Sequence, residues 1–395
     1  MSPSAQTVGT YSSAGAAGKA VLTTVSTVAR VEGVTGKVLI GGASGLVGLA
    51  AVEKFMAEGY EVVAASRTAP DVEGSGSWCH VALDLRDREA CRVAAQAWSD
   101  VTHVVYTAVY EKPGLIPGWS ERDQMETNLE MLQNLMDPLC ERAAGLRHVS
   151  LLQGTKAYGV HLHPMPVPGR ERYPRDQHEN FYWLQEDYVR AKSAAQGWQF
   201  SIWRPQLIVG PNHGVVMNLP PIIGAYAAIC REEDIPFGFP GGPSWVWEAV
   251  DARLVADALA WGATSSNAAG ETFNLTNGEV FEWRNLWPSF AETLGVEAAP
   301  DAPRSLAEFL PSKAAVWDRI VTKHGLRPVK MGELLGESHH YADFCFAYGA
   351  EQTPPPAFVS TVKIKQAGFC GVQDTEESFR HWFRDLIRRR ILPPA

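Results

Sequence analysis

The chain has 395 residues, and its 35 Lys and Arg against 44 Asp and Glu give a formal net charge of −9. Hydrophobic residues make up 46% and charged residues 20% of the sequence, ordinary values that exclude a disordered or fibrous chain. The negative charge argues against nucleic acid or an anionic membrane as the main partner. No apolar run reaches 18 residues, so we expect no membrane span.

The six cysteines are widely spaced, and none forms a C-x-x-C pair. This pattern argues against a disulfide scaffold and a zinc site, and it is typical of a reducing compartment. We therefore expect a cytoplasmic protein without a metal. A homodimer is compatible with the sequence, although no pattern indicates one.

From residue 37 onward, strand-like and helix-like segments alternate. Such alternation implies right-handed crossovers and a parallel sheet, so we predict a doubly wound, Rossmann-type α/β fold. The expected strands are 37–41, 60–66, 80–84, 101–107, 146–153 and 200–209, and the expected helices between them are 46–59, 88–98 and 126–144.

The remaining chain is less regular. A helix is expected over 251–262 with Asp251 at its N-cap, then a short strand at 272–275 and a closing helix at 378–390. Residues 1–34 are rich in small residues and suggest a flexible N-terminal extension. We expect an NADP-binding Rossmann domain over 35–205 plus about 250–278, and a smaller, mostly helical substrate-covering lobe over about 206–249 plus 279–395.

A G-x-x-G-x-x-G loop follows the first expected strand and opens the first expected helix. Glycine permits the tight turn and lets the backbone approach a pyrophosphate, while the helix N-terminus offers free N–H groups. In this position the loop predicts a dinucleotide cofactor. Its residues are Gly42, Ala43, Ser44, Gly45, Leu46, Val47 and Gly48.

The end of the second strand distinguishes between the two nicotinamide cofactors. A carboxylate there would bind the ribose 2′-hydroxyl of NAD, but this chain has Ser66-Arg67 and no acid before Asp71. A guanidinium pairs with a 2′-phosphate and stacks on adenine, so we predict NADPH. After the third strand, Asp84-Leu85 places a carboxylate where it can accept a hydrogen bond from the adenine amino group.

Two arrangements compete for the catalytic role. Dinucleotide folds of this length often use a Tyr-x-x-x-Lys pair on one face of a helix, and Tyr188 and Lys192 fit this spacing. The alternative combines 151–158 (L-L-Q-G-T-K-A-Y), at the end of the fifth strand, with 180–187 (N-F-Y-W-L-Q-E-D), which opens the next helix.

The second arrangement resembles the progesterone 5β-reductase and iridoid synthase-like (PRISE) family, which are atypical extended short-chain dehydrogenases. In that family the lysine comes from a G-x-K-x-Y segment, and the tyrosine follows N-F directly. The resemblance therefore implies Lys156 and Tyr182 as catalytic residues. It covers most of the chain after residue 37, including S-I-W-R-P-Q-L-I at 201–208 and F-N-L-T-N-G at 273–278.

The resemblance implies an NADPH-dependent reductase of activated C=C bonds, acting on a small apolar enone or enal. Hydride addition to the β-carbon of such a substrate leaves negative charge on the carbonyl oxygen, which a phenol within hydrogen-bond reach stabilises. Tyr182 is the expected donor. Lys156 either lowers the pKa of this phenol or holds the nicotinamide ribose, and the sequence leaves both roles open.

Further residues are expected around the cofactor and the substrate. Phe346 matches a phenylalanine of the family's pocket, while Trp245 is expected there because the large apolar side chains of the covering lobe suit an apolar enone. Ala108-Val109 stands where the family often has Thr-Trp, and Pro354–Ala357 lies in an insertion relative to plant members. These departures concern the nicotinamide contacts and the substrate range more than the reaction type. The expected cofactor neighbours are Ala108, Gln153, Tyr182, Pro205, Ile208 and Met217, and the expected pocket residues are Phe346 and Trp245.

Two other functions stay open at this point. A carbonyl reductase or sugar-nucleotide epimerase of the same broad fold would use Tyr188 and Lys192. A non-catalytic NADP-binding sensor would bind the cofactor without transferring hydride to any acceptor.

Overall fold

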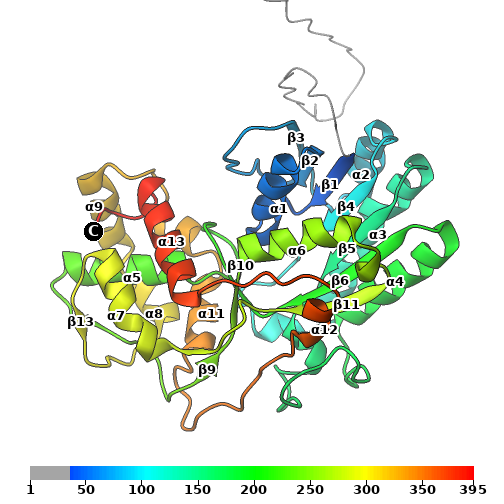
Figure 1. Cartoon of the computed structure of the whole chain (residues 1–395). Helices are drawn as coiled ribbons and strands as arrows, with labels where there is room; N and C mark the ends of the chain where they lie inside the picture. Colours follow the sequence, from blue (N-terminus) through cyan, green and yellow to red (C-terminus); the bar gives the residue numbers. More distant parts are fainter. Residues whose placement is uncertain (1–35) are drawn as a thin grey trace, which may run out of the picture.

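The computed structural model describes residues 36–395, so the predicted N-terminal extension lies outside the described residues. A sheet lobe and a helical lobe lie beside each other (Figure 1). The sheet has seven strands in the order β3-β2-β1-β4-β5-β6-β11, all parallel, which confirms the predicted Rossmann-type fold. The strands are β1 (Lys37–Gly41), β2 (Glu61–Ser66), β3 (Trp78–Ala82), β4 (His103–Tyr106), β5 (His148–Leu152), β6 (Gln199–Pro205) and β11 (Glu271–Leu275).

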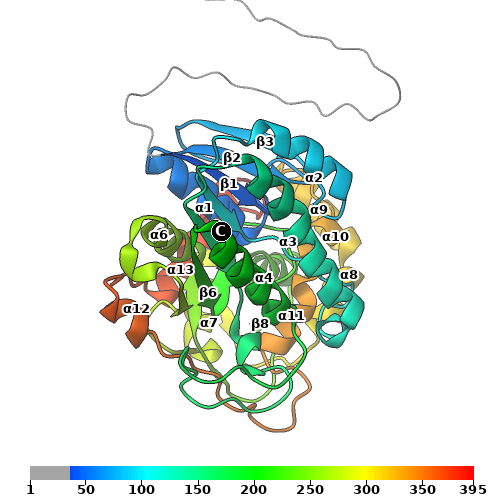
Figure 2. The same cartoon turned by 90° about the vertical axis from the view of Figure 1, so that its right-hand side faces the viewer.

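Helices cover both faces of this sheet (Figure 2). Leu39 packs into the core shared with α2, α3 and α4, while its neighbours Val38 and Ile40 pack into the core shared with α1, α6 and α12. Successive strand side chains point to opposite faces, so a near-continuous apolar strand fills both cores. The helices are α1 (Leu46–Ala57), α2 (Arg88–Ala94), α3 (Arg122–Arg142), α4 (Phe181–Gln196), α6 (Ala252–Thr264) and α12 (Val362–Gln366).

The helical lobe has its own core, whose buried apolar residues all come from the chain between Leu207 and Leu392. None of the helices within residues 36–395 is long and apolar enough to cross a membrane. The helices of the helical lobe are α5 (Pro220–Glu232), α7 (Trp283–Leu294), α8 (Leu306–Ser312), α9 (Ala314–His324), α10 (Met331–Leu335), α11 (Ser338–Cys345) and α13 (Thr375–Arg388).

Short elements connect and extend the two lobes. The remaining strands pair two by two, as β10 with β7, β12 with β9 and β13 with β8. They are β7 (Leu207–Val209), β8 (Phe237–Gly238), β9 (Val246–Trp247), β10 (Ala249–Asp251), β12 (Phe281–Glu282) and β13 (Ala298–Ala299). Single 3₁₀ turns are η1 (Ala95–Ala97), η2 (Pro117–Ser120), η3 (Thr155–Tyr158) and η4 (Ser266–Ala268).

The differences from the predicted elements have physical reasons. The predicted strand at 200–209 is two strands, because Pro205 ends the pairing of β6 with β11 and β7 then pairs with β10 instead. The predicted strand at 80–84 starts two residues too late and ends two too late, so Asp84 follows β3 rather than ending it. The predicted cap is confirmed, because the Asp251 carboxylate accepts from the Arg253 N–H at the start of α6.

Candidate active site

A cavity of about 690 Å³ lies at the carboxyl ends of the parallel strands, where the helical lobe meets the sheet. Its wall combines the glycine loop, the ends of β2, β4, β5 and β6, helix α11, and the Pro354–Ala357 segment. This is the edge at which open α/β sheets bind their ligands. Within residues 36–395, no group of three or more His, Cys, Asp or Glu side chains could hold a metal ion.

The glycine loop forms one end of the cavity. Helix α1 starts after Gly45 with no side-chain cap and no acid in its first turn, so its first N–H groups and its positive dipole end suit an anion. A Cβ on Gly48 would lie 2.1 Å from the Gly42 carbonyl oxygen, so this position requires glycine. Of the predicted loop, Gly42, Ser44, Gly45, Leu46 and Val47 line the cavity, while Ala43 and Gly48 do not.

Beyond the loop, the ends of β2 and β3 bring charged groups to the cavity. Four of the predicted cofactor contacts line it: Ser66, Arg67, Asp84 and Leu85. Arg86, which the sequence reasoning missed, holds Asp84 through Nε–Oδ1 and Nη2–Oδ2 contacts of 3.0 and 2.6 Å. These bonds lower the pKa of the Asp84 carboxyl. The exposed Arg67 guanidinium and the Asp84 carboxylate are thus charged groups that this end of the cavity offers to a cofactor.

Lys156 and Tyr182 both line the same cavity, although 25 residues separate them. Asn180 connects their segments: its side-chain oxygen accepts from the Tyr182 N–H at 3.0 Å, and its Nδ2 donates to the Lys156 carbonyl at 3.3 Å. Asn180 therefore caps the N-terminus of α4 and also connects this helix to η3 through a hydrogen bond. The structure brings the two residues predicted from the resemblance into one site.

The two side chains have shifted acidities. Burial raises the pKa of the Tyr182 phenol, and the Glu111 carboxylate adds to the effect. Burial lowers the pKa of the Lys156 ammonium, while Glu111 opposes that change. The Tyr182 hydroxyl forms no hydrogen bond with other residues of the described chain, so its proton is available to a ligand in the cavity.

Gln153 lines the cavity, but its side chain forms hydrogen bonds with other protein groups. Its Nε2 donates to the buried carboxylate of Glu186 at 2.9 Å and to the Tyr182 carbonyl at 3.2 Å. Its Oε1 accepts from Arg204 Nε at 2.8 Å. The end of β5, the first turn of α4 and β6 are thus held together beneath the site.

The alternative pair lies elsewhere. The Tyr188 hydroxyl donates to Asp137 at 2.6 Å, and the Lys192 ammonium contacts the same carboxylate at 2.6 Å. Both side chains face α3, and neither lines the cavity. Their four-residue spacing, which suggested a catalytic pair, lets both side chains contact Asp137 and so joins α4 to α3.

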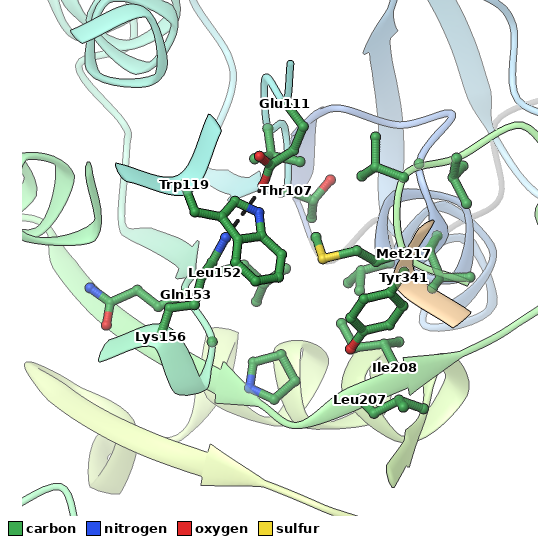
Figure 3. Close-up of a pocket in the computed structure, with 18 of the residues that line it drawn as sticks. Thr107, Glu111, Trp119, Leu152, Gln153, Lys156, Leu207, Ile208, Met217 and Tyr341 are labelled. Carbon is green, nitrogen blue, oxygen red and sulfur yellow. Dashed lines mark hydrogen bonds and ion pairs between the residues drawn. The ribbon is translucent and has the colours of Figure 1, made fainter. Parts of the chain in front are cut away.

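Besides Arg86, the cavity residues that the sequence did not predict include Glu111, Trp119 and Tyr341. Figure 3 shows Glu111 and Lys156 facing each other beside Trp119, with Tyr341 on the other side of the cavity. Glu111 and Trp119 come from the long β4–α3 connection, which has no period or motif. The one available sign of Glu111 was that it is the first charged residue after the buried strand β4.

One predicted pocket residue, Phe346, lies away from the cavity. Phe346 is 2% exposed, does not line the cavity, and packs in the helical-lobe core against Trp283 at a 4.9 Å ring separation. Tyr341 and Phe344, three residues apart on α11, face the cavity, and Phe346 follows the helix on another side. The other predicted neighbours line the cavity: Ala108, Pro205, Ile208, Met217 and Trp245.

Similar proteins place this site in a known family. Residues 91–348 match the PRISE-like Rossmann-fold domain. The (S)-8-oxocitronellyl enol synthase of Antirrhinum majus is 32% identical over 314 residues, 76% of each chain, and the 3-oxo-Delta(4,5)-steroid 5-beta-reductase of Arabidopsis thaliana is 32% identical over 327 residues, 80% of each chain.

Solved structures agree on the fold. The UDP-glucose 4-epimerase of Thermus thermophilus, in complex with NAD, superposes with a TM-score of 0.60 at 19% identity, covering 88% of this chain and 99% of that one. The Bordetella bronchiseptica enzyme WbmG, also with NAD, superposes with a TM-score of 0.59 at 15% identity, over 91% and 97% of the two chains. The fold, the match over residues 91–348 and the two plant relatives together establish that the chain belongs to the PRISE family of Rossmann-fold proteins.

Proposed function

We propose that the protein is an NADPH-dependent reductase of activated C=C bonds, which carries out 1,4-reduction of enones or enals. The observation that carries the proposal is the convergence of Lys156 and Tyr182 on the cavity that begins at the glycine loop. The names of the two plant relatives add support, since a 3-oxo-Delta(4,5)-steroid is itself an enone. In this proposal the sheet lobe binds the cofactor and the helical lobe covers the substrate.

The chain's own residues have distinct roles in the proposed reaction. The bound nicotinamide supplies the hydride that reaches the β-carbon of the substrate. Tyr182 donates its hydroxyl hydrogen bond to the carbonyl oxygen as charge develops there, and gives its proton to the enolate. The Lys156 ammonium stabilises the phenolate that this transfer leaves behind. Trp245 and Phe344 form an apolar wall that keeps water from the reacting atoms.

Arg67 supports the choice of NADPH over NADH. It stands at the end of β2, lines the cavity and is exposed toward solvent, which suits a guanidinium that binds a 2′-phosphate. No carboxylate occupies the position that would bind a 2′-hydroxyl, since the next acid after Ser66 is Asp71. The NAD named with the two structural neighbours is consistent with a nicotinamide cofactor.

The test compares enones and enals with saturated ketones as acceptors, following the loss of nicotinamide absorbance with NADPH and with NADH. Wild type, Tyr182→Phe and Tyr188→Phe are measured side by side. We expect enones to be reduced, NADPH to be preferred, and Tyr182→Phe alone to lower kcat by about 100-fold or more. Reduction of saturated ketones that depends on Tyr188 would overturn the proposal, and so would NADPH binding with no turnover across the acceptor panel.

A further inference from the structure

Glu111 is a buried carboxylate that neither the glycine loop nor the Tyr182–Lys156 pair explains. Its side chain is fully buried, and its Oε1 lies 3.4 Å from Lys156 Nζ. Its other oxygen accepts a hydrogen bond from Gln124 Nε2 at 2.5 Å. A carboxylate is costly to bury unless it is paired and hydrogen-bonded, and Glu111 meets both conditions at the wall of the cavity (Figure 3).

Helix α3 holds the backbone on both sides of Glu111. Asn128 accepts from the Tyr110 N–H at 2.8 Å and donates to the Tyr110 carbonyl at 2.8 Å. Gln124, which contacts the carboxylate, also accepts from the Lys112 N–H at 3.0 Å. Gln124 and Asn128 are almost completely buried, so two buried amides fix one carboxylate toward Lys156.

Glu111 is the negative charge that faces the Lys156 ammonium. The Lys156 side chain is 12% exposed, and its Nζ lies 4.3 Å from the centre of the Trp119 ring. The face of an aromatic ring attracts an ammonium, but this attraction is weaker than that of a desolvated carboxylate. Among the residues that the structure describes, Glu111 is the one carboxylate whose charge acts on Lys156.

We propose that Glu111 is a positioning residue that keeps Lys156 protonated and fixed beside Tyr182, and that it thereby sets the alkaline limit of the reaction. The inference rests on the proposed reductase function, in which the ammonium stabilises the Tyr182 phenolate. Without Glu111, the buried ammonium loses its counter-charge and releases its proton at a lower pH. A neutral lysine no longer stabilises the phenolate, so turnover fails earlier as pH rises.

The other titratable groups around the pair do not replace Glu111. His161, from the segment after η3, faces Lys156, but burial lowers the pKa of this imidazole to about 4, so it is neutral near pH 7. Tyr182 comes from α4 and Tyr341 from α11, and burial raises the pKa of both phenols. Gln124, on α3, carries no charge.

The decisive variant is Glu111→Gln, which keeps the side-chain length and the oxygen that accepts from Gln124 but removes the charge. The matched control is Glu121→Gln, an equal charge change in the same β4–α3 connection, at an exposed side chain paired with Lys112. Protein labelled with ¹³C at the lysine side chains is titrated by NMR, and the spectrum of Lys156→Arg assigns the Lys156 resonance. This titration requires no turnover.

We expect the Lys156 titration midpoint to fall by about one pH unit or more in Glu111→Gln and to stay unchanged in Glu121→Gln. The alkaline limb of kcat/KM for an enone should move by a similar amount, with the rates converging at low pH. An unchanged midpoint, or a rate loss that is equal at every pH, overturns the inference.

A second variant, Glu111→Asp, tests the same inference if Glu111→Gln does not fold. Glu111→Asp keeps the charge but withdraws it from Lys156 by one methylene, so both the midpoint and the alkaline limb should move in the same direction by a smaller amount. A wild-type enzyme that reduces no enone would overturn the proposed function, while the lysine titration would still decide the role of Glu111.

Discussion

A side-chain carbon added to Gly154 would lie 3.0 Å from the hydroxyl oxygen of Tyr182. This is closer than an ordinary van der Waals contact, so the phenol must move by a few tenths of an ångström to accept it. The backbone at Gly154 is extended, with φ −171°, a conformation that any residue adopts. The position of the phenol, and not the backbone conformation, therefore favours glycine here.

Gly154→Ala should consequently affect the reaction more than the fold. Because small displacements of a reacting group lower rates steeply, we expect kcat to fall by about tenfold or more. The melting temperature should stay close to that of wild type. The control is Gly145→Ala, where an added carbon meets no atom within 4 Å. Equal kinetics for the two variants would show that the phenol does not need its present position.

Arg67→Ala should change the cofactor preference. The loss of a guanidinium at the end of β2 removes the proposed partner of the 2′-phosphate, so we expect KM for NADPH to rise by about tenfold or more and KM for NADH to change little. Arg88→Ala serves as the control, because Arg88 is exposed at the start of α2 and does not line the cavity. A parallel rise in both KM values would exclude phosphate recognition by Arg67.

Phe346→Ala should mainly lower stability, whereas Phe344→Ala should mainly weaken substrate binding. Phe346→Ala empties a core position between Trp283 and Phe239, so we expect the free energy of unfolding to fall by about 3–5 kcal/mol. Phe344→Ala opens the cavity wall, and we expect its main effect on KM for the enone. Chemical denaturation and initial-rate kinetics on both variants provide the comparison, which fails if Phe344→Ala is the more destabilising of the two.

Glu248 should make stability depend on pH. Its carboxylate accepts from the Val359 N–H at 2.8 Å, and burial raises the pKa of the carboxyl to about 7. Between about pH 4.5 and 7 the folded chain therefore binds more protons than the unfolded chain, so this residue's contribution to stability falls as pH rises through that window.

Glu248→Gln should remove this dependence, because the amide is neutral and still accepts from Val359. Relative to wild type, the variant should gain stability as pH rises to about 7 and then stay level. Urea denaturation across this pH range measures the difference, with exposed Glu126→Gln as the control. A constant difference between Glu248→Gln and wild type at every pH would contradict the assignment.

The sheet lobe was predictable because its rules are local. Buried runs such as 37–41, the glycine loop and the Asp251 cap each follow from a few adjacent residues, and the parallel sheet follows from their alternation. The end of β6 at Pro205 is a local signal too, but the pairing of β7 with β10 is not, because β10 lies some 40 residues further on.

The site was predictable in part for the same reason. Lys156 and Tyr182 lie in short segments that resemble a family, and the glycine loop has a local geometry. Glu111 and Tyr341 reach the cavity through packing between distant elements, which no local pattern encodes. Phe346 lies away from the cavity because a resemblance aligns residues but does not determine which side of a helix end faces the cavity.

The tie between Lys156 and Tyr182 through Asn180 has a consequence for how activity is lost. In a Tyr-x-x-x-Lys pair, one helical turn maintains the geometry, and the pair survives as long as the helix does. Here the two groups belong to separate segments joined by side-chain hydrogen bonds. In the proposed reaction, partial opening of the connection between η3 and α4 would stop turnover while the sheet stays intact. Turnover should therefore report local unfolding earlier than a global spectroscopic signal does.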